Sequence, residues 1–310
     1  MQAVRRTFLF PTVVLCLAAA SGFAQSQSAA EHTRAVGVQM RNVMYHFTDP
    51  IAVHIVHLEG KLIPTEKTDI PVFDDKQSFR LAIESAEIAI RPNAMANLLN
   101  QHVFAEKDTP LKAIAISVER DAIKIKGKLH SKGDIPFETK GKLSVTPQGE
   151  IRIHAETIRA AHLPVKGLMD LMGVKIASLI STNKVRGVRA EGNDLLLNPE
   201  RILPPPQIQG RVTDVQLRGN DIVQYFGEKK AISAPNRFRN YMAYRGAQLR
   251  FGKLTMTDTD MILIDMDPQD PFDFYLDRYK EQLVAGYTKT TPAFGLRVYM
   301  RDFNKLRSTH

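Results

Sequence analysis

The middle of the chain is a run of short alternating segments joined by tight turns, and this pattern restricts the fold more than any other feature. Between residues 114 and 155, apolar side chains recur at every second position, as where Ile123 and Ile125 alternate with Lys124 and Lys126. A period of two is typical of strands with one buried face. Because the connections are only a few residues long, neighbouring strands must run antiparallel. The region therefore predicts an antiparallel meander.

Similar patterns predict strands on both sides of the meander. They are expected at residues 36–48, 51–63 and 79–90, in a hairpin at 188–197, and at 209–218, 248–256 and 261–266, the last two paired across residues 258–260. The apolar phase shifts between Ile83 and Ala86, which indicates a β-bulge. With no internal repeat and no long flexible linker, one compact α+β unit is expected.

Two apolar helices are predicted, because apolar side chains there follow the spacing of one helix face. The first covers residues 92–104, with Pro92 in its first turn. The second covers residues 166–181. Its stripe is formed by Leu168, Met169, Leu171, Met172, Ile176, Leu179 and Ile180. Such a stripe either fills a core or lines a cavity for variable apolar ligands, and both interpretations stay open.

The first 24 residues have the form of a secretory signal peptide. Arg5 and Arg6 precede a short apolar run, and Gly22 and Ala24 occupy the −3 and −1 positions of a cleavage site. An uncleaved anchor is the alternative, although the run is short for a membrane span. The predicted organisation is a signal peptide at 1–24, a mobile lead-in at 25–35 and a single α+β domain at 36–310, with a core at 36–228 and an extension of the sheet at 229–310.

The charge balance narrows the possible partners. The chain has 42 Lys and Arg against 33 Asp and Glu, a formal charge of +9. Removal of the signal, with its two arginines and no acid, leaves +7 and also removes Cys16, the only cysteine. The mature chain therefore cannot use disulfides, thiolate catalysis or cysteine-bound metal. Because an exported protein rarely meets nucleic acid, the positive charge favours an anionic membrane surface or a cell-envelope polymer.

Signatures of the common catalytic and cofactor sites are missing from the sequence, including G-x-S-x-G, H-E-x-x-H, the Walker loop and G-x-G-x-x-G. His54 and His57 are three residues apart, which places them on opposite faces of a regular strand. Two scattered histidines do not make a metal site. No catalytic residue, metal or cofactor is therefore expected.

An acidic cluster near the C-terminus leaves two alternatives open. It consists of Asp258, Asp260, Asp265, Asp267, Asp270, Asp273 and Asp277. Residues 229–257 hold seven basic residues and no acid, so the simplest interpretation is charge pairing between neighbouring strands. The alternatives are a calcium site, although the EF-hand Gly and Glu are missing, and a hydrolase or transferase that acts on an envelope polymer through two carboxylates in residues 258–277.

The order of these elements resembles the LmeA-like family of exported phospholipid-binding proteins over residues 88–226. The resemblance rests on the apolar helix at 92–104, the SVERDAIKIKGKL and GKLSVTPQGEIRI hairpins, a helix ending near Ile180, and the PPPQIQGRVTDVQLRGNDIV segment. It implies a long curved antiparallel sheet wrapped around two apolar helices, similar to tubular lipid-binding folds, with an apolar groove and no catalytic residues. The segment after Lys229 lies outside this pattern.

The resulting expectation is an exported periplasmic or envelope protein that holds the acyl chains of phospholipid or another lipid, for lipid transfer or envelope maintenance. A structural assembly factor that presents sheet edges is a third possibility. The residues expected to line the groove are Leu98, Leu99, Val103, Leu168, Met169, Leu171, Met172, Ile176, Leu179 and Ile180. Those expected to form a basic rim for head groups are Lys124, Lys126, Lys128, Arg237, Arg239 and Arg245. The three lysines share one strand face, which should be exposed because they cannot be buried together unpaired.

Overall fold

The computed structural model describes residues 34–66, 68–131, 133–160, 169–170, 177, 185–228 and 237–307. All of them belong to one compact unit, Arg34–His310. The described residues form two β-sheets and a few short helices, so the predicted α+β class with a large curved sheet is confirmed. The signal peptide lies outside these residues and stays a prediction.

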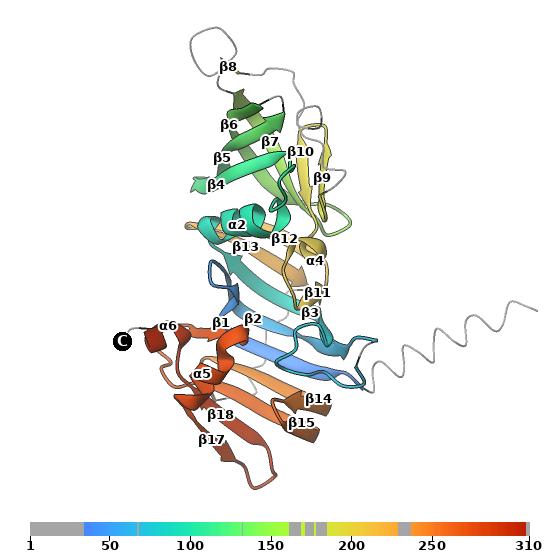
Figure 1. The fold of residues 1–310 in the computed structure, drawn as a ribbon, viewed down its shortest axis with the longest axis vertical. Helices are drawn as coiled ribbons and strands as arrows, with labels where there is room; N and C mark the ends of the chain where they lie inside the picture. Colours follow the sequence, from blue (N-terminus) through green and yellow to red (C-terminus); the bar gives the residue numbers. More distant parts are fainter. Residues whose placement is uncertain are drawn as a thin grey trace, which may run out of the picture. The chain divides into compact units, whose positions relative to one another are not determined.

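The larger sheet has eleven strands built around three long consecutive ones (Figure 1). These are β1 (Val36–Thr48), β2 (Ile51–Pro64) and β3 (Phe79–Ile90), antiparallel to one another and close to the predicted bounds. Beyond β3 lie β13 (Asp221–Gly227) and β12 (Val212–Arg218), with β11 (Gln207–Gln209) also paired to β3. Beyond β1 lie β14 (Tyr241–Phe251), β15 (Leu254–Asp265), β18 (Leu296–Met300) and β17 (Tyr287–Thr290), with β16 (Phe272–Tyr275) also paired to β1.

Two irregularities set which side chains of these strands face inward. The predicted bulge in β3 is confirmed, since Gly60 pairs with Ile83 while its neighbour Glu59 pairs with Ser85. The second irregularity, in β1, was not predicted. Asn42 adopts a φ of 51°, and the buried positions shift from even numbers before it to odd numbers after it. Both strands therefore keep an apolar inner face along their whole length.

The smaller sheet is the predicted meander, with its strands in the order β4-β5-β6-β7-β10-β9. Their bounds are β4 (Leu111–Glu119), β5 (Ala122–Ser131), β6 (Gly133–Val145), β7 (Ile151–Ala160), β9 (Val188–Glu191) and β10 (Asp194–Leu197), and β8 (Met169–Asp170) pairs with β7. The expectation of one long sheet is wrong, because the chain leaves β3 into a helix that contacts both β2 and β4 and so separates the two sheets.

That helix is the first of the two predicted. It consists of α2 (Pro92–Leu98) followed by a π-helical turn, η1 (Leu99–Val103), with Pro92 in the first turn. Of the second predicted helix, Met169 and Asp170 form strand β8 and Ala177 is helical, while its other residues lie outside those described. Four short helices were not predicted: α4 (Pro199–Ile202), η2 (Leu276–Arg278), α5 (Tyr279–Val284) and α6 (Phe303–Arg307).

The C-terminal strands differ from the sequence interpretation. The turn between β14 and β15 falls at Gly252, whose φ is 58°, and Phe251 pairs with Leu254 across it. The predicted strand at 248–256 is therefore wrong, and Asp260 lies within β15 rather than in a turn. The larger sheet is also not purely antiparallel, because β18 runs parallel to β15 and β16 runs parallel to β1.

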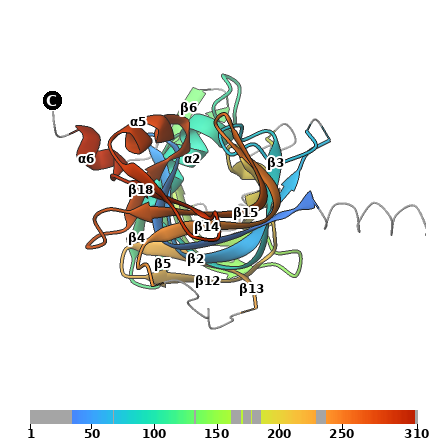
Figure 2. The ribbon, with the colours of Figure 1, turned by 90° about the horizontal axis from the view of Figure 1, so that it is seen from below.

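The long strands of the larger sheet are curved (Figure 2), and both of their faces carry apolar clusters. On β14, Met242 and Tyr244 face the main core, which also receives α2. Tyr241 and Ala243 face the opposite side, where they form a small separate cluster with residues of β15. The inner and outer faces of this sheet are thus chemically distinct environments, and they carry different candidate sites.

Candidate functional site

An apolar cavity lies on the inner face of the larger sheet, where inward-facing side chains of several strands meet α2 and α4. Its lining includes Met40, Tyr45 and Phe47 of β1, Val53, Ile55 and Leu58 of β2, Phe79, Leu81, Ile83, Ile88 and Ile90 of β3, Gln224 and Phe226 of β13, Met242 and Tyr244 of β14, Phe274 of β16, and Met95 and Leu98 of α2. Ile151 of the smaller sheet completes one side. The cavity therefore lies where both sheets and the separating helix contribute side chains.

The chemistry of this lining is almost entirely apolar. Among the described side chains of this lining, only Gln224, Tyr45 and Tyr244 carry a nitrogen or oxygen atom. Burial raises the pKa of Tyr45 and of Tyr244 above the usual tyrosine value, so both phenols stay neutral. The lining thus offers no ionised group and no candidate for acid–base chemistry at ordinary pH.

The cavity is narrow, with atom-free space of about 960 Å³ (open solvent included) of which the centre of a water-sized sphere can reach only about 70 Å³. Its lining includes three methionine side chains, Met40, Met95 and Met242. Unbranched thioether side chains adjust readily to the shape of a neighbour. The geometry suits a thin flexible chain better than a bulky rigid ring system.

A second, polar cavity adjoins the first, and the two share Phe79 and Leu203 in their linings. We call it the vestibule. Its polar lining comprises Thr65, Lys76, Gln77, His102, Arg186, Glu200, Arg201 and Gln207, with Val103 and Pro205 as further apolar members. The centre of a water-sized sphere can reach about 540 Å³ there. A polar space with more basic than acidic side chains therefore stands directly beside the apolar one.

The structure brings together only some of the side chains predicted to line a groove. Leu98 lines the apolar cavity, Val103 lines the vestibule, and Leu99 is buried in the main core at 2% exposure. For Met169 only the strand backbone is described. The remaining six predicted residues, Leu168, Leu171, Met172, Ile176, Leu179 and Ile180, lie outside the described part of the chain.

The predicted basic rim does not border the apolar cavity or the vestibule. Lys126 and Lys128 are exposed as expected, but Lys124 is half-buried because its ammonium lies 2.9 Å from Glu138 and 3.4 Å from Glu119. Glu138 also lies 3.4 Å from Lys126. Carboxylates on neighbouring strands therefore neutralise much of this lysine face, which the sequence of β5 alone does not reveal.

The three arginines of the predicted rim lie elsewhere on the larger sheet. Arg237 and Arg239 line a shallow cavity with Ile264, which belongs to the outer cluster and not to the main core. Arg245 of β14 lies 3.6 Å from Asp260 of β15, an ion pair of the kind expected from the charge pattern. None of these three arginines faces the side of the sheet that carries the apolar cavity.

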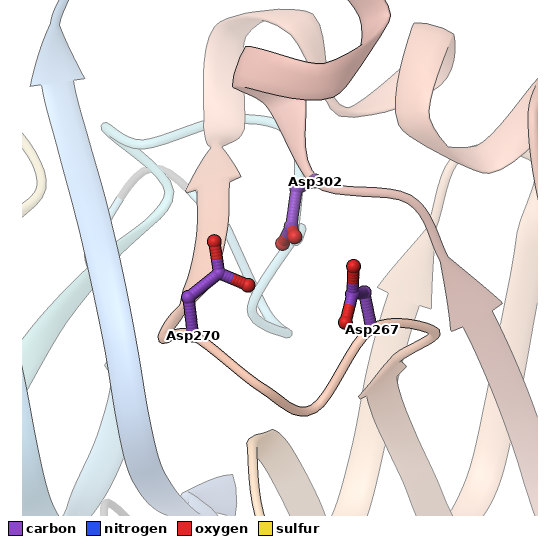
Figure 3. Close-up of side chains that lie close together, drawn as sticks. All are labelled: Asp267, Asp270 and Asp302. Atoms are coloured by element: carbon purple, nitrogen blue, oxygen red, sulfur yellow. The ribbon is translucent and has the colours of Figure 1, made fainter.

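The acidic cluster surrounds a lysine. Asp267, Asp270 and Asp302 converge (Figure 3), with carboxylate oxygens within 4.8 Å of one another. The ammonium of Lys305 lies 2.6 Å, 3.0 Å and 2.9 Å from these three carboxylates. Hydrogen bonds from Lys305 lower the pKa of Asp267, whereas burial raises the pKa of Asp302. An internal cation thus occupies the position that calcium would take, which argues against the calcium alternative.

Other carboxylates of the cluster are also engaged individually. Asp260 accepts a hydrogen bond from Arg297, and Asp277 accepts one from Lys76. Asp273 lies 2.6 Å from Nε2 of His46, although the angle does not suit a hydrogen bond. Asp265 accepts hydrogen bonds from Asn240 and from a backbone amide, and burial raises its pKa to about 6. Asp265 is the one carboxylate among the described residues that line the outer cavity, whereas a glycosidase needs a pair.

The histidines do not form a metal site among the described residues, but one prediction about them is wrong. The register between β2 and β3 shifts between Ile55 and His57, so a residue is skipped. His54 and His57 consequently lie on the same, outer face. Burial lowers the pKa of both imidazoles, and Nε2 of His54 lies 2.8 Å from Oδ1 of Asn42.

The sequence interpretation missed the residues that distinguish the vestibule. Arg186 and Arg201 flank the β9–β10 hairpin, which was predicted, and closing a hairpin brings its flanking residues together. That proximity was a usable signal. Leu203 stands at the start of the triple-proline segment and was interpreted only as part of a connector. Its contact with both cavities depends on a tertiary fold that spacing alone does not reveal.

Among the described residues, no helix combines the length and the apolar character needed to cross a membrane. Comparisons with family models, curated proteins and solved structures found no match to this chain. The resemblance to the LmeA-like family therefore stays a prediction, and the function has to be argued from the two adjoining cavities.

Proposed function

We propose that this protein binds an acyl lipid, with the hydrocarbon chain held in the apolar cavity between the two sheets. The observation that carries the proposal is the lining of that cavity, where Gln224, Tyr45 and Tyr244 are the sole described side chains that bear polar atoms. The narrow space and the three methionines favour a flexible chain over a compact ligand. The resemblance to exported phospholipid-binding proteins over residues 88–226 supports the same function.

The energetics of such binding need no specific motif. Each methylene that moves from water into an apolar cavity contributes about 0.8 kcal/mol, so affinity should grow about fourfold per methylene. Because the described lining holds no ionised group, an alkyl chain that enters does not have to strip water from a charge. Chain length, rather than head-group contacts alone, should therefore control affinity.

The protein is proposed to be exported. A basic start, a short apolar run and the small residues Gly22 and Ala24 support secretion with cleavage after Ala24, which would bring the lipid-binding domain to the periplasm or envelope. There it would exchange lipid with anionic membrane surfaces, in transfer or envelope maintenance. N-terminal sequencing of the exported protein tests this part, and a mature chain that begins at Met1 would refute it.

The lipid-binding proposal is tested by displacement of a fluorescent fatty acid with n-alkanols of increasing length. We expect the dissociation constant to fall about fourfold per added methylene until the chain fills the cavity. A dissociation constant that does not depend on chain length would show that the cavity does not receive the alkyl chain.

A further inference from the structure

Two arginines, Arg186 and Arg201, line the vestibule beside the apolar cavity. Val188 pairs with Leu197 at the end of the β9–β10 hairpin, and the amide of Asn198 donates to the carbonyl of Gly187 at 2.8 Å. The backbone at Gly187 packs so tightly on Arg201 that an added Cβ would lie 2.7 Å from the Cβ of Arg201. Arg186 directly precedes Gly187 and lines the same vestibule as Arg201.

Among the described residues, neither of these guanidinium groups has a carboxylate partner, although carboxylates lie nearby. Glu200, on the same short helix as Arg201, accepts a hydrogen bond from the amide of Gly210 at 2.8 Å instead. Lys76, the other cation of this lining, is bound to Asp277 at 2.8 Å. Arg189, only three residues from Arg186, shows the contrasting arrangement, since its guanidinium is paired with two glutamates.

The position of the two arginines beside the apolar cavity indicates which ligand group they could bind. Phe79 and Leu203 belong to both linings, so the vestibule adjoins the apolar cavity and can receive the polar end of a chain that lies there. Two guanidinium groups that form no ion pair with any described carboxylate can attract an oxyanion, and their planar donors match the geometry of phosphate and carboxylate. A neutral hydroxyl or ester would gain far less there.

We infer that Arg186 and Arg201 form a binding site for an anionic head group, so that the carried molecule is an acyl lipid ending in a phosphate or carboxylate. The inference rests on the proposed function, because it takes the chain in the apolar cavity as given. It relocates the head-group site from the lysine face of β5 and from the outer arginines to the vestibule. It also excludes neutral acyl lipids as the preferred cargo.

The test compares dodecyl phosphate, dodecanoate and dodecanol as competitors of a fluorescent fatty alcohol, with inorganic phosphate as a fourth arm. Dodecyl phosphate should bind the wild-type protein more tightly than dodecanol. In an Arg186→Gln/Arg201→Gln variant, its affinity should fall on the order of tenfold while dodecanol affinity stays unchanged. The two anionic ligands distinguish phosphate from carboxylate as the preferred head group.

A matched control removes the same charge elsewhere. Arg237→Gln/Arg239→Gln takes two exposed guanidinium groups from the outer face, and its affinity for dodecyl phosphate should equal that of the wild type. An equal loss in both double variants would reduce the effect to net charge and overturn the inference. So would equal binding of dodecyl phosphate and dodecanol to the wild type, or binding of inorganic phosphate as tight as that of dodecyl phosphate.

The outcomes separate this inference from the proposed function. If dodecanol and dodecyl phosphate bind equally, the chain site stands and the head-group site falls. If neither displaces the probe from the wild type, the proposed function fails and the inference fails with it. Single variants at each arginine, checked by circular dichroism, ensure that a loss of affinity is not a loss of fold.

Discussion

A charge placed in the wall of the apolar cavity should separate a ligand-binding surface from ordinary core. Ile88 of β3 lines the cavity, is only partly buried, and pairs across the sheet with Gln224, the one amide in the lining. Ile123 of β5 is the matched control, because it is 1% exposed and does not line the cavity. The variants to compare are Ile88→Asp and Ile123→Asp.

The expected magnitudes differ because the two environments differ. Full burial of an isoleucine side chain contributes roughly 1.5–3 kcal/mol, and an ionised carboxylate in a dry core adds a larger penalty. We expect Ile123→Asp to lose about 5 kcal/mol or more, comparable to the whole stability of many domains. Ile88→Asp should lose about 2 kcal/mol, because the carboxylate faces a space that water can enter and lies opposite an amide donor.

The assay is urea unfolding followed by far-ultraviolet circular dichroism, since the chain has no tryptophan to report on the core. It is paired with displacement of a fluorescent fatty acid. Ile88→Asp should stay folded and lose binding, whereas Ile123→Asp should not fold. Unfolding of both variants would mean that the wall is plain core. A folded Ile88→Asp variant with unchanged binding would place the lipid elsewhere.

Three further predictions concern the C-terminal polar cluster and the sheet. Replacing Lys305 by Met should lower the free energy of unfolding by about 2 kcal/mol, since buried Asp302 loses its cation. Calcium should leave the melting temperature of the wild type unchanged. A rise in melting temperature with calcium would restore the calcium-site alternative. Burial raises the pKa of Asp265 from 3.8 to about 6, so its stabilising contribution is complete below pH 4 and is lost as pH rises through 6. Between those limits the wild type should lose up to about 3 kcal/mol relative to Asp265→Asn, and parallel urea-unfolding profiles of the two proteins would contradict this. Gly227→Ala should destabilise the protein by at least about 2 kcal/mol, because φ at Gly227 is +62° and the new Cβ would lie against the carbonyl of Glu84. The control is Gly219→Ala, where φ is +60° but no atom lies within 4 Å of the new Cβ; it should lose only about 1 kcal/mol of unfolding free energy in the same assay.

Regular alternation made the strands predictable. The meander and the three long strands have inner faces that repeat every second residue, so their bounds follow from the sequence within a few positions. Even the bulge opposite Gly60 left a visible phase shift in β3. The irregularity at Asn42 left one too, from Val38 and Met40 at even positions to Val43 and Tyr45 at odd positions, but the sequence interpretation did not use it.

Features that depend on contacts between distant segments could not be predicted. The turn at Gly252 is an exception, because its signal is local: apolar side chains move from odd positions at Leu249 and Phe251 to even positions at Leu254 and Met256. The parallel pairing of β15 with β18 joins segments that share no local signal. Neutralisation of Lys124 by Glu138 depends on the register between β5 and β6, which only the folded sheet determines.

The same reason explains the outcome for the candidate site. Sequence periodicity identified apolar stripes, of which Leu98 reaches the cavity, but a cavity is defined by facing surfaces and not by one helix. The pattern of β3 is that of an ordinary strand interior, and only its position opposite α2 and α4 makes it the wall of a cavity. The role of Arg186, which forms no ion pair with a described residue, could be argued only once the ion pairs of its neighbours were known.

Direct identification of bound lipid tests the central claim most simply. Purified wild-type protein, isolated after export, should yield near-stoichiometric acyl lipid on organic-solvent extraction and mass spectrometry. The Ile88→Asp variant, prepared in parallel and shown to be folded, should yield little, because the charge blocks the apolar cavity. Wild-type protein free of acyl lipid, or equal lipid in both preparations, would contradict the account.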